Sequence, residues 1–136
     1  MGIGITAYGV LSRGLLSGHW STGQPAAPGD FRTHSPRFNG ENLTHNLALV
    51  ESLRTVARDK GVPVAQIAIA WALSRGGDIV PLVGARRRDR LTEALGALDL
   101  DLTPGDLARN EEAVPAGAAA GDRYAPAQMA TLDSER

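Results

Sequence analysis

The sequence predicts an α/β fold in which parallel strands alternate with helices. Two apolar runs, residues 3–8 and 78–84, are too short for helices, and each leads into a glycine-containing turn. Stretches with apolar residues every three or four positions follow each run, as amphipathic helices require. The resulting order is strand, long loop, helix, helix, strand, helix, helix, which is typical of parallel α/β sheets.

The first strand is predicted over Ile3–Tyr8, where apolar and small residues alternate before the glycine-bounded stretch GVLSRG. Residues 17–42 then form a long loop, because glycine and proline recur and aliphatic residues are few. Trp20, Phe31 and Phe38 lie in this loop. These rings either anchor the loop against a groove or simply pin it to the core.

Two helices are expected after the loop. Apolar residues recur at helical spacing from Leu43 to Ala57, and Gly61 ends the pattern. Pro63 opens a second helical run, VAQIAIAWALSRGG, which is apolar on nearly every face. We therefore expect the second helix to be buried between layers.

The second strand is predicted within DIVPLVG, residues 78–84, whose continuous apolar character favours a parallel strand covered on both faces. After Gly84, a further helix is predicted from an apolar stripe at helical spacing. The stripe consists of Leu91, Ala94, Leu95 and Leu98.

A last helix is expected after Thr103 and Pro104, which have the residue types of a capped helix start. The tail, residues 115–136, is rich in alanine, glycine and proline, and is either packed irregularly over the rest or of low complexity. A parallel sheet of two strands leaves open edges and too little buried apolar area. The rest of the sheet is therefore expected to be absent or to come from another chain.

Composition limits the function classes. The 136 residues correspond to one domain, residues 1–136, and the formal net charge of −1 gives no global attraction to nucleic acid or to an anionic membrane. The absence of cysteine excludes disulfide scaffolds, thiolate zinc sites and cysteine nucleophiles, and fits a reducing compartment. The apolar beginning lacks a basic n-region, so we interpret it as mature chain rather than a signal peptide. No metal site is predicted.

Consecutive arginines, Arg86–Arg88, stand at the junction between the second strand and the next helix. Positive side chains in a first helical turn are unfavourable by roughly a few tenths of a kcal/mol each, because they oppose the helix dipole. A phosphate held by backbone amides and guanidinium groups would offset this. The alternative is a solvated charge run that uses Asp89 and Glu93 as local partners.

A nucleophilic hydrolase is a weaker hypothesis, since Ser12 or Ser17 could act with His19 and Asp30. These residues lie in or beside a glycine-rich loop without a strained elbow motif such as Gly-x-Ser-x-Gly. Coincidence explains their presence better.

Three segments together resemble, in order and spacing, the C-terminal part of the NADP-dependent aldo-keto reductases. They are GIGITAYGVLSRGLLSG, AQIAIAWALSRG and VPLVGARRRDRLTEALGALDLDLTP, and the closing segment from Val114 is similar to the tails of bacterial members. The resemblance covers essentially the whole chain. It implies the C-terminal part, about the last two β/α units plus the tail, of a (β/α)8 TIM barrel, with a cytoplasmic location.

The resemblance also assigns a cofactor site. Tyr8 falls where an aromatic ring stacks on the nicotinamide, or it is a core tyrosine. The other matched positions are Gly9, Leu11 and Arg13 over the pyrophosphate; Gly84, Ala85 and Arg86 around the adenosine 2′-phosphate; Arg90, which grips that phosphate; and Glu93 and Ala94 at the adenine. Ala94 departs from the asparagine common in the family and lacks its amide hydrogen bonds. The implied cofactor is NADP(H).

The family reduces a carbonyl compound with NADPH and uses a tyrosine, a lysine, an aspartate and a histidine from the first half of the barrel. Nothing in this chain matches those positions, since its only lysine is Lys60 and its histidines lie in or just beyond the long loop. No catalytic residue is therefore predicted. The chain is interpreted as the cofactor-binding end of a reductase, read from an internal methionine, a disrupted gene or a deliberate fragment. The alternative is a non-catalytic half-barrel that binds NADP(H) or pairs with a copy of itself or a separate N-terminal half.

Overall fold

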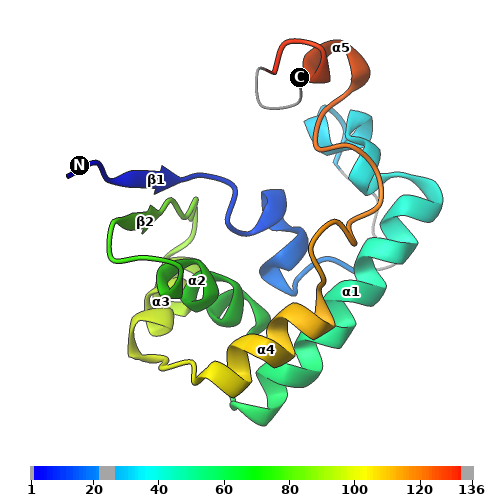
Figure 1. The fold of residues 1–136 in the computed structure, drawn as a ribbon. Helices are drawn as coiled ribbons and strands as arrows, with labels where there is room; N and C mark the ends of the chain where they lie inside the picture. The colour runs from blue at the N-terminus through cyan, green and yellow to red at the C-terminus, as the bar shows by residue number, and fades with distance from the viewer. Residues whose placement is uncertain (1, 22–26, 133–136) are drawn as a thin grey trace.

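The computed structural model describes residues 2–21 and 27–132, and these form two short strands at one side of a group of helices (Figure 1). The strands and α-helices are β1 (Ile5–Ala7), α1 (Gly40–Asp59), α2 (Val64–Ser74), β2 (Ile79–Pro81), α3 (Arg88–Leu95), α4 (Pro104–Ala113) and α5 (Pro126–Met129). Short 3-10 helices are η1 (Ser12–Ser17), η2 (Phe31–His34), η3 (Pro36–Phe38) and η4 (Gly96–Asp99). The predicted α/β order is confirmed.

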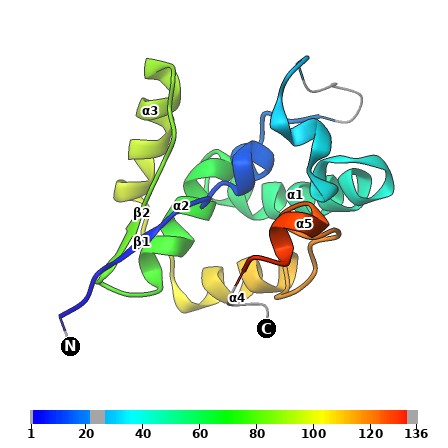
Figure 2. The same ribbon diagram turned by 90° about the horizontal axis from the view of Figure 1, so that it is seen from above.

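β1 and β2 form a parallel two-stranded sheet in which Ile5 pairs with Ile79 (Figure 2). The Ile5 amide donates to the Asp78 carbonyl at 2.7 Å, and the Leu82 amide donates to the Ala7 carbonyl at 2.9 Å. α2 packs against β2, yet Val80 is 55% exposed. The expectation that the second strand is covered on both faces was therefore wrong for the described residues, because helices cover the sheet incompletely.

The hydrophobic core lies among the helices rather than on the sheet. α1 packs against α2 and α4, and Val50 of α1 and Ile67 of α2 are 1% and 0% exposed. α1 starts at Gly40, earlier than predicted from its apolar spacing, and Gly61 follows it with a positive φ of 70°. α2 is buried along most of its length, as its all-apolar sequence predicts.

α3 packs with a different face from the predicted one. Ala94 and Ala97 are buried, whereas the leucines of the predicted stripe, Leu91, Leu95 and Leu98, are 48%, 53% and 68% exposed. The small residues allow a close approach to α2, where Gln66 Nε2 donates to the Glu93 carbonyl at 2.8 Å. A Cβ at Gly96 would lie 2.3 Å from that amide nitrogen. The helix predicted from the stripe is confirmed, but of the stripe residues Ala94 is buried and the leucines point outward.

The long loop contains short 3-10 helices and is pinned by aromatic contacts. Trp20 and Phe38 meet edge to face with their ring centroids 5.4 Å apart, and Phe38 is buried. Pinning to the core is therefore correct for these two rings. Phe31 is 57% exposed and does not share this role.

The tail folds back beside the N-terminal half of α1 (Figure 1), and Asn46 holds it there. The Asn46 side chain is 1% exposed; its Nδ2 donates to the carbonyls of Arg37 and Ala120 at 3.0 and 2.9 Å, and its Oδ1 accepts from the Ala120 amide at 2.8 Å. His45 Nε2 also contacts the Ala118 carbonyl at 2.8 Å. These bonds confirm that the tail packs over another part of the chain, although its residues Pro126–Met129 form the short helix α5 and are not irregular.

Candidate functional site

The loops that follow β1 and β2 face each other across a cleft of about 770 Å³, here called the arginine cleft. Every predicted cofactor-site residue except Tyr8 lines it. These are Gly9, Leu11, Arg13, Gly84, Ala85, Arg86, Arg90, Glu93 and Ala94. Because the strands are parallel neighbours, their carboxyl ends bring together two segments more than 60 residues apart in the sequence.

The loop after β1 has an unusual backbone that sets the position of Arg13. Ser12 and Arg13 have positive φ values of 47° and 58°, and Gly14 follows at 95°. Left-handed conformations are uncommon for residues with a Cβ. Arg13 Nη1 donates to the Arg123 carbonyl at 2.9 Å, and its guanidinium lies 4.4 Å from the Tyr124 ring centroid. The Arg13 side chain thus lies between the loop and the tail.

The loop after β2 carries the consecutive arginines. α3 begins at Arg88 with Arg87 as its N-cap, so Arg86 and Arg87 precede the first turn instead of lying in it as predicted. Arg87 Nη2 donates to Asp89 at 2.7 Å, which raises the pKa of Arg87 and lowers the pKa of Asp89. The local-partner interpretation therefore holds for Arg87. In the described part of the chain, Arg86 pairs with no carboxylate.

Arg90 and Glu93 meet a residue that the sequence did not single out as a partner. The Nε2 atom of His19 lies 3.0 and 3.2 Å from the two carboxylate oxygens of Glu93, and it also contacts Arg90. Arg90 Nη1 is 3.5 Å from Glu93 Oε2. His19 is 74 positions away from Glu93 in the sequence, so no local spacing could have revealed this cluster.

Tyr8 lies outside the arginine cleft and is 69% exposed, which excludes the core-tyrosine alternative. Its hydroxyl is 2.9 Å from the Tyr124 hydroxyl. This hydrogen bond raises the pKa of Tyr8 and lowers the pKa of Tyr124. Tyr8 therefore joins the end of β1 to the tail.

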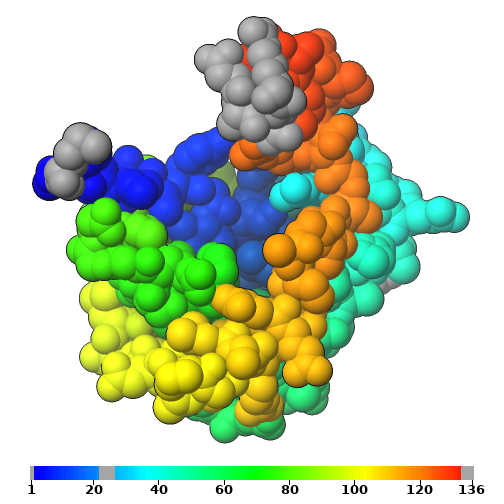
Figure 3. Space-filling model, in the orientation of Figure 1, coloured from blue at the N-terminus to red at the C-terminus, as the bar shows by residue number. Residues whose placement is uncertain are grey.

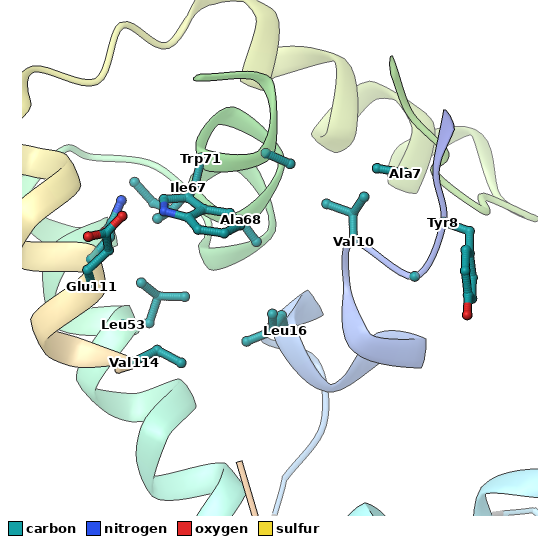
Figure 4. Close-up of a pocket in the computed structure, with 13 residues that line it drawn as sticks. Ala7, Tyr8, Val10, Leu16, Leu53, Ile67, Ala68, Trp71, Glu111 and Val114 are labelled. Carbon is teal, nitrogen blue, oxygen red and sulfur yellow. The ribbon is translucent and has the colours of Figure 1, made fainter. Parts of the chain in front are cut away.

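A second hollow, here called the apolar cavity, lies between β1, η1 and the helices α1, α2 and α4 (Figure 3). Its volume is about 380 Å³, and Figure 4 shows Leu16, Leu53, Ile67 and Trp71 around it with Tyr8 at one edge. Glu111 is the acidic residue of its lining. The cavity offers apolar contact area and few polar groups.

The hydrolase hypothesis fails on geometry. Ser17 Oγ donates to the Gly14 carbonyl at 2.6 Å and accepts from the His19 backbone amide at 3.2 Å, while the His19 ring contacts Glu93. Asp30 accepts from the Arg32 side chain, which holds the pKa of that carboxyl at about 2. No serine of this set therefore contacts a histidine ring nitrogen.

Two features are absent from the described residues. No helix in residues 2–21 and 27–132 is long and apolar enough to cross a membrane. Within the same residues, no group of three or more histidine, cysteine, aspartate or glutamate side chains could hold a metal ion.

Comparison with known proteins identifies the family. A sequence model of the Aldo/keto reductase family matches residues 1–115. The chain is 37% identical over 124 residues to "Probable aldo-keto reductase 1" of Glycine max, and 35% identical over 124 residues to Aldo-keto reductase yakc of Schizosaccharomyces pombe, whose name specifies NADP(+). Each match covers 91% of this chain and 36% of the relative. The chain therefore belongs to the aldo/keto reductase family and spans about a third of the length of these relatives.

A solved structure supports the same assignment. The glycerol dehydrogenase AKR11B4 from Gluconobacter oxydans superposes with a TM-score of 0.75 at 26% identity, over 82% of this chain and 34% of that protein. The helix-rich α/β arrangement described above is thus similar to one part of a larger family structure.

Proposed function

We propose that this chain forms the NADP(H)-binding end of a cytoplasmic aldo/keto reductase, with residues 1–136 as the last two β/α units and tail of an eight-stranded barrel. The complete enzyme would reduce an aldehyde or ketone. Residues 9–14 would hold the pyrophosphate and residues 84–90 the 2′-phosphate, while Tyr8 would contact the nicotinamide. The catalytic groups would come from a part of the barrel outside this chain.

The arginine cleft is the observation that carries the proposal. Its lining includes Arg13, Arg32, Arg86, Arg87 and Arg90, with Glu93 as its acidic member. NADP(H) carries a pyrophosphate and a 2′-phosphate, and guanidinium groups are the side chains best suited to phosphate oxygens. The volume of about 770 Å³ also lies in the ordinary range for small-molecule sites.

The residues present therefore fit the cofactor, with one exception at the adenine. Ala94 is 8% exposed and packs toward α2, so it offers no polar group to the base. When bound, NADPH supplies a hydride for reduction of a carbonyl carbon. The role of this chain is to bind and orient that cofactor through the loops after β1 and β2.

The first experiment compares NADP+ and NAD+ binding to the chain and to Arg90→Gln. We expect NADP+ to bind more tightly than NAD+, and Arg90→Gln to weaken NADP+ binding by about tenfold or more, because charge-assisted hydrogen bonds are lost. Arg88→Gln is the matched control, since Arg88 belongs to the same arginine run but does not line the cleft. Equal affinity for both cofactors, or equal loss in the two variants, would contradict the proposal.

Exposed apolar residues on the strands favour a second candidate role, pairing with another chain that completes the barrel. Ile5, Val80 and Leu82 are 54%, 55% and 51% exposed, and the sheet has two strands in the described part of the chain. Sedimentation velocity of the chain and of Ile5→Lys tests this role. Association that disappears with Ile5→Lys supports it, while a monomer at all concentrations contradicts self-pairing.

A further inference from the structure

A smaller cleft lies where the end of β1, the start of η3 and the tail meet, and we call it the tail cleft. Its volume is about 240 Å³. Its lining comprises Tyr8, Gly9, Ser12, Arg13, Ser35, Arg37, Phe38, Arg123 and Tyr124, and it includes no acidic side chain among the described residues. Arg13, Arg37 and Arg123 therefore bring three guanidinium groups to one small space.

Two of these arginines have few polar partners. Arg37 Nε donates to the Gly121 carbonyl at 3.1 Å, and Arg13 Nη1 donates to the Arg123 carbonyl. Within the described part of the chain neither forms an ion pair, unlike Arg32 and Arg87, which pair with Asp30 and Asp89. Their donors remain suited to an anion.

Ser35 supplies an independent sign of a polar ligand. It is 4% exposed, and its Oγ has no hydrogen-bond partner among the residues that the structure describes. A buried hydroxyl without a partner has lost its hydrogen bonds to water without replacement, so such a group calls for a specific explanation. A ligand oxygen in the tail cleft would satisfy it.

We infer that the tail cleft binds the carboxylate of a small organic acid, and that the substrate of the proposed reductase is therefore a carbonyl compound that carries a carboxylate. Arg37 and Ser35 hold that carboxylate. The size of the cleft suits a short acid rather than a dinucleotide, for which the arginine cleft has about three times the volume. Tyr8 lines the tail cleft and is also the residue expected to contact the nicotinamide. A short substrate could therefore place its carboxylate in the tail cleft and its carbonyl group near the nicotinamide. The inference that the bound carboxylate belongs to the substrate rests on the proposed function. The inference that the tail cleft binds an anion does not.

The test uses succinate as probe and the uncharged succinamide as its isostere, with binding followed by amide shifts in ¹H–¹⁵N NMR at constant ionic strength. Succinate is expected to shift amides around Ser35 and Gly9 and to bind at least about tenfold more tightly than succinamide. Arg37→Gln is expected to abolish most of the preference for succinate. Arg37→Lys is expected to retain part of this preference, because lysine keeps the positive charge without the guanidinium geometry. Equal binding of the two probes would overturn the inference.

His45→Ala is the matched control, because it also removes one side-chain bond to a tail carbonyl but contributes no charge to the cleft. If it weakens succinate binding as much as Arg37→Gln does, the effect arises from tail docking and the inference fails. Pyrophosphate is a third probe. If it binds through Arg37 and succinate does not, the tail cleft serves the cofactor and the inference is overturned.

Arg90→Gln separates this inference from the proposed function. It is expected to weaken NADP+ binding and to leave succinate binding unchanged, since Arg90 does not line the tail cleft. Succinate binding without any NADP+ binding would retain the anion site and refute the reductase proposal. NADP+ binding without a preference for succinate over succinamide would retain the reductase proposal and refute the anion site.

Discussion

The helices and the sheet of this chain are built from similar apolar residues but are buried to very different extents. Ile67 in α2 is 0% exposed, whereas Ile5 in β1 is 54% exposed. Among the described residues, the core around Ile67 is built from α1 and α2 with Leu15 and Phe38 of the 3-10 helices, and neither strand contributes a residue to it. The comparison indicates that the helices supply most of the stability, while the strands position the two loops that line the arginine cleft.

The strongest test of this contrast replaces the two isoleucines separately by alanine. Ile67→Ala is expected to lower the free energy of unfolding by about 2–5 kcal/mol, because it removes buried methyl groups next to the apolar cavity. Ile5→Ala is expected to lower it by less than about 1 kcal/mol, since half of that side chain is already in water. Urea unfolding followed by tryptophan fluorescence measures both. Similar losses would show that the sheet belongs to the stabilising core.

Asn46→Ala tests the attachment of the tail to α1, with a smaller expected effect. It removes hydrogen bonds to both polar groups of Ala120 and to the Arg37 carbonyl in a buried position, so a loss of about 2–3 kcal/mol is expected. Limited proteolysis should then cut residues 115–125 faster than in the unchanged chain. Asn42→Ala removes one bond to the Pro36 carbonyl and serves as control. Equal protease resistance in all three proteins would contradict the role of Asn46.

The capping box at the start of α4 is expected to contribute less than the Asn46 hydrogen bonds, with a defined pH dependence. Thr103→Ala is expected to cost about 1 kcal/mol, because the Thr103 side chain accepts from the Asp106 amide. Lys60, then the side chain and backbone of Thr103, hold the pKa of Asp106 at about 2, below its usual value. Because the folded state has the lower pKa, this contribution is complete above about pH 4 and is lost as pH falls towards 2.

Asp106→Asn therefore makes stability less dependent on pH between about 4 and 2, which acid titration of the unfolding free energy measures. Some dependence remains in this variant, because the Asp30 carboxyl also has a pKa of about 2 beside Arg32. An unchanged acid profile in Asp106→Asn would contradict the assigned contribution of the Lys60 ion pair.

Local patterns predicted most of the fold, because helix periods and glycine and proline positions act over a few residues. The boundaries of α2 and the capped start of α4 followed from Pro63, Thr103 and Pro104. The packed face of α3 was missed, because leucine spacing marks an apolar face without saying that alanines and Gly96 fit closer to α2.

The candidate site was predicted by resemblance to a family rather than from local chemistry. That resemblance named residues that now line one cleft, yet it did not include His19, which meets Glu93 only through the fold. Asn46 and Ser35 were missed for the same reason, since a polar residue in a helix or loop gives no sign of burial in the sequence. Long-range contacts set the environment of these residues, and a single sequence does not encode them in any short spacing.

Hydrogen–deuterium exchange with and without NADP+ tests the central claim most directly, because it reports where along the chain the cofactor acts. The account predicts slower exchange at residues 9–14 and 82–94 with NADP+, a smaller effect with NAD+, and no change in α1. Unchanged exchange in both loops, or equal protection by the two cofactors, would contradict the claim that the arginine cleft binds NADP+ through its 2′-phosphate.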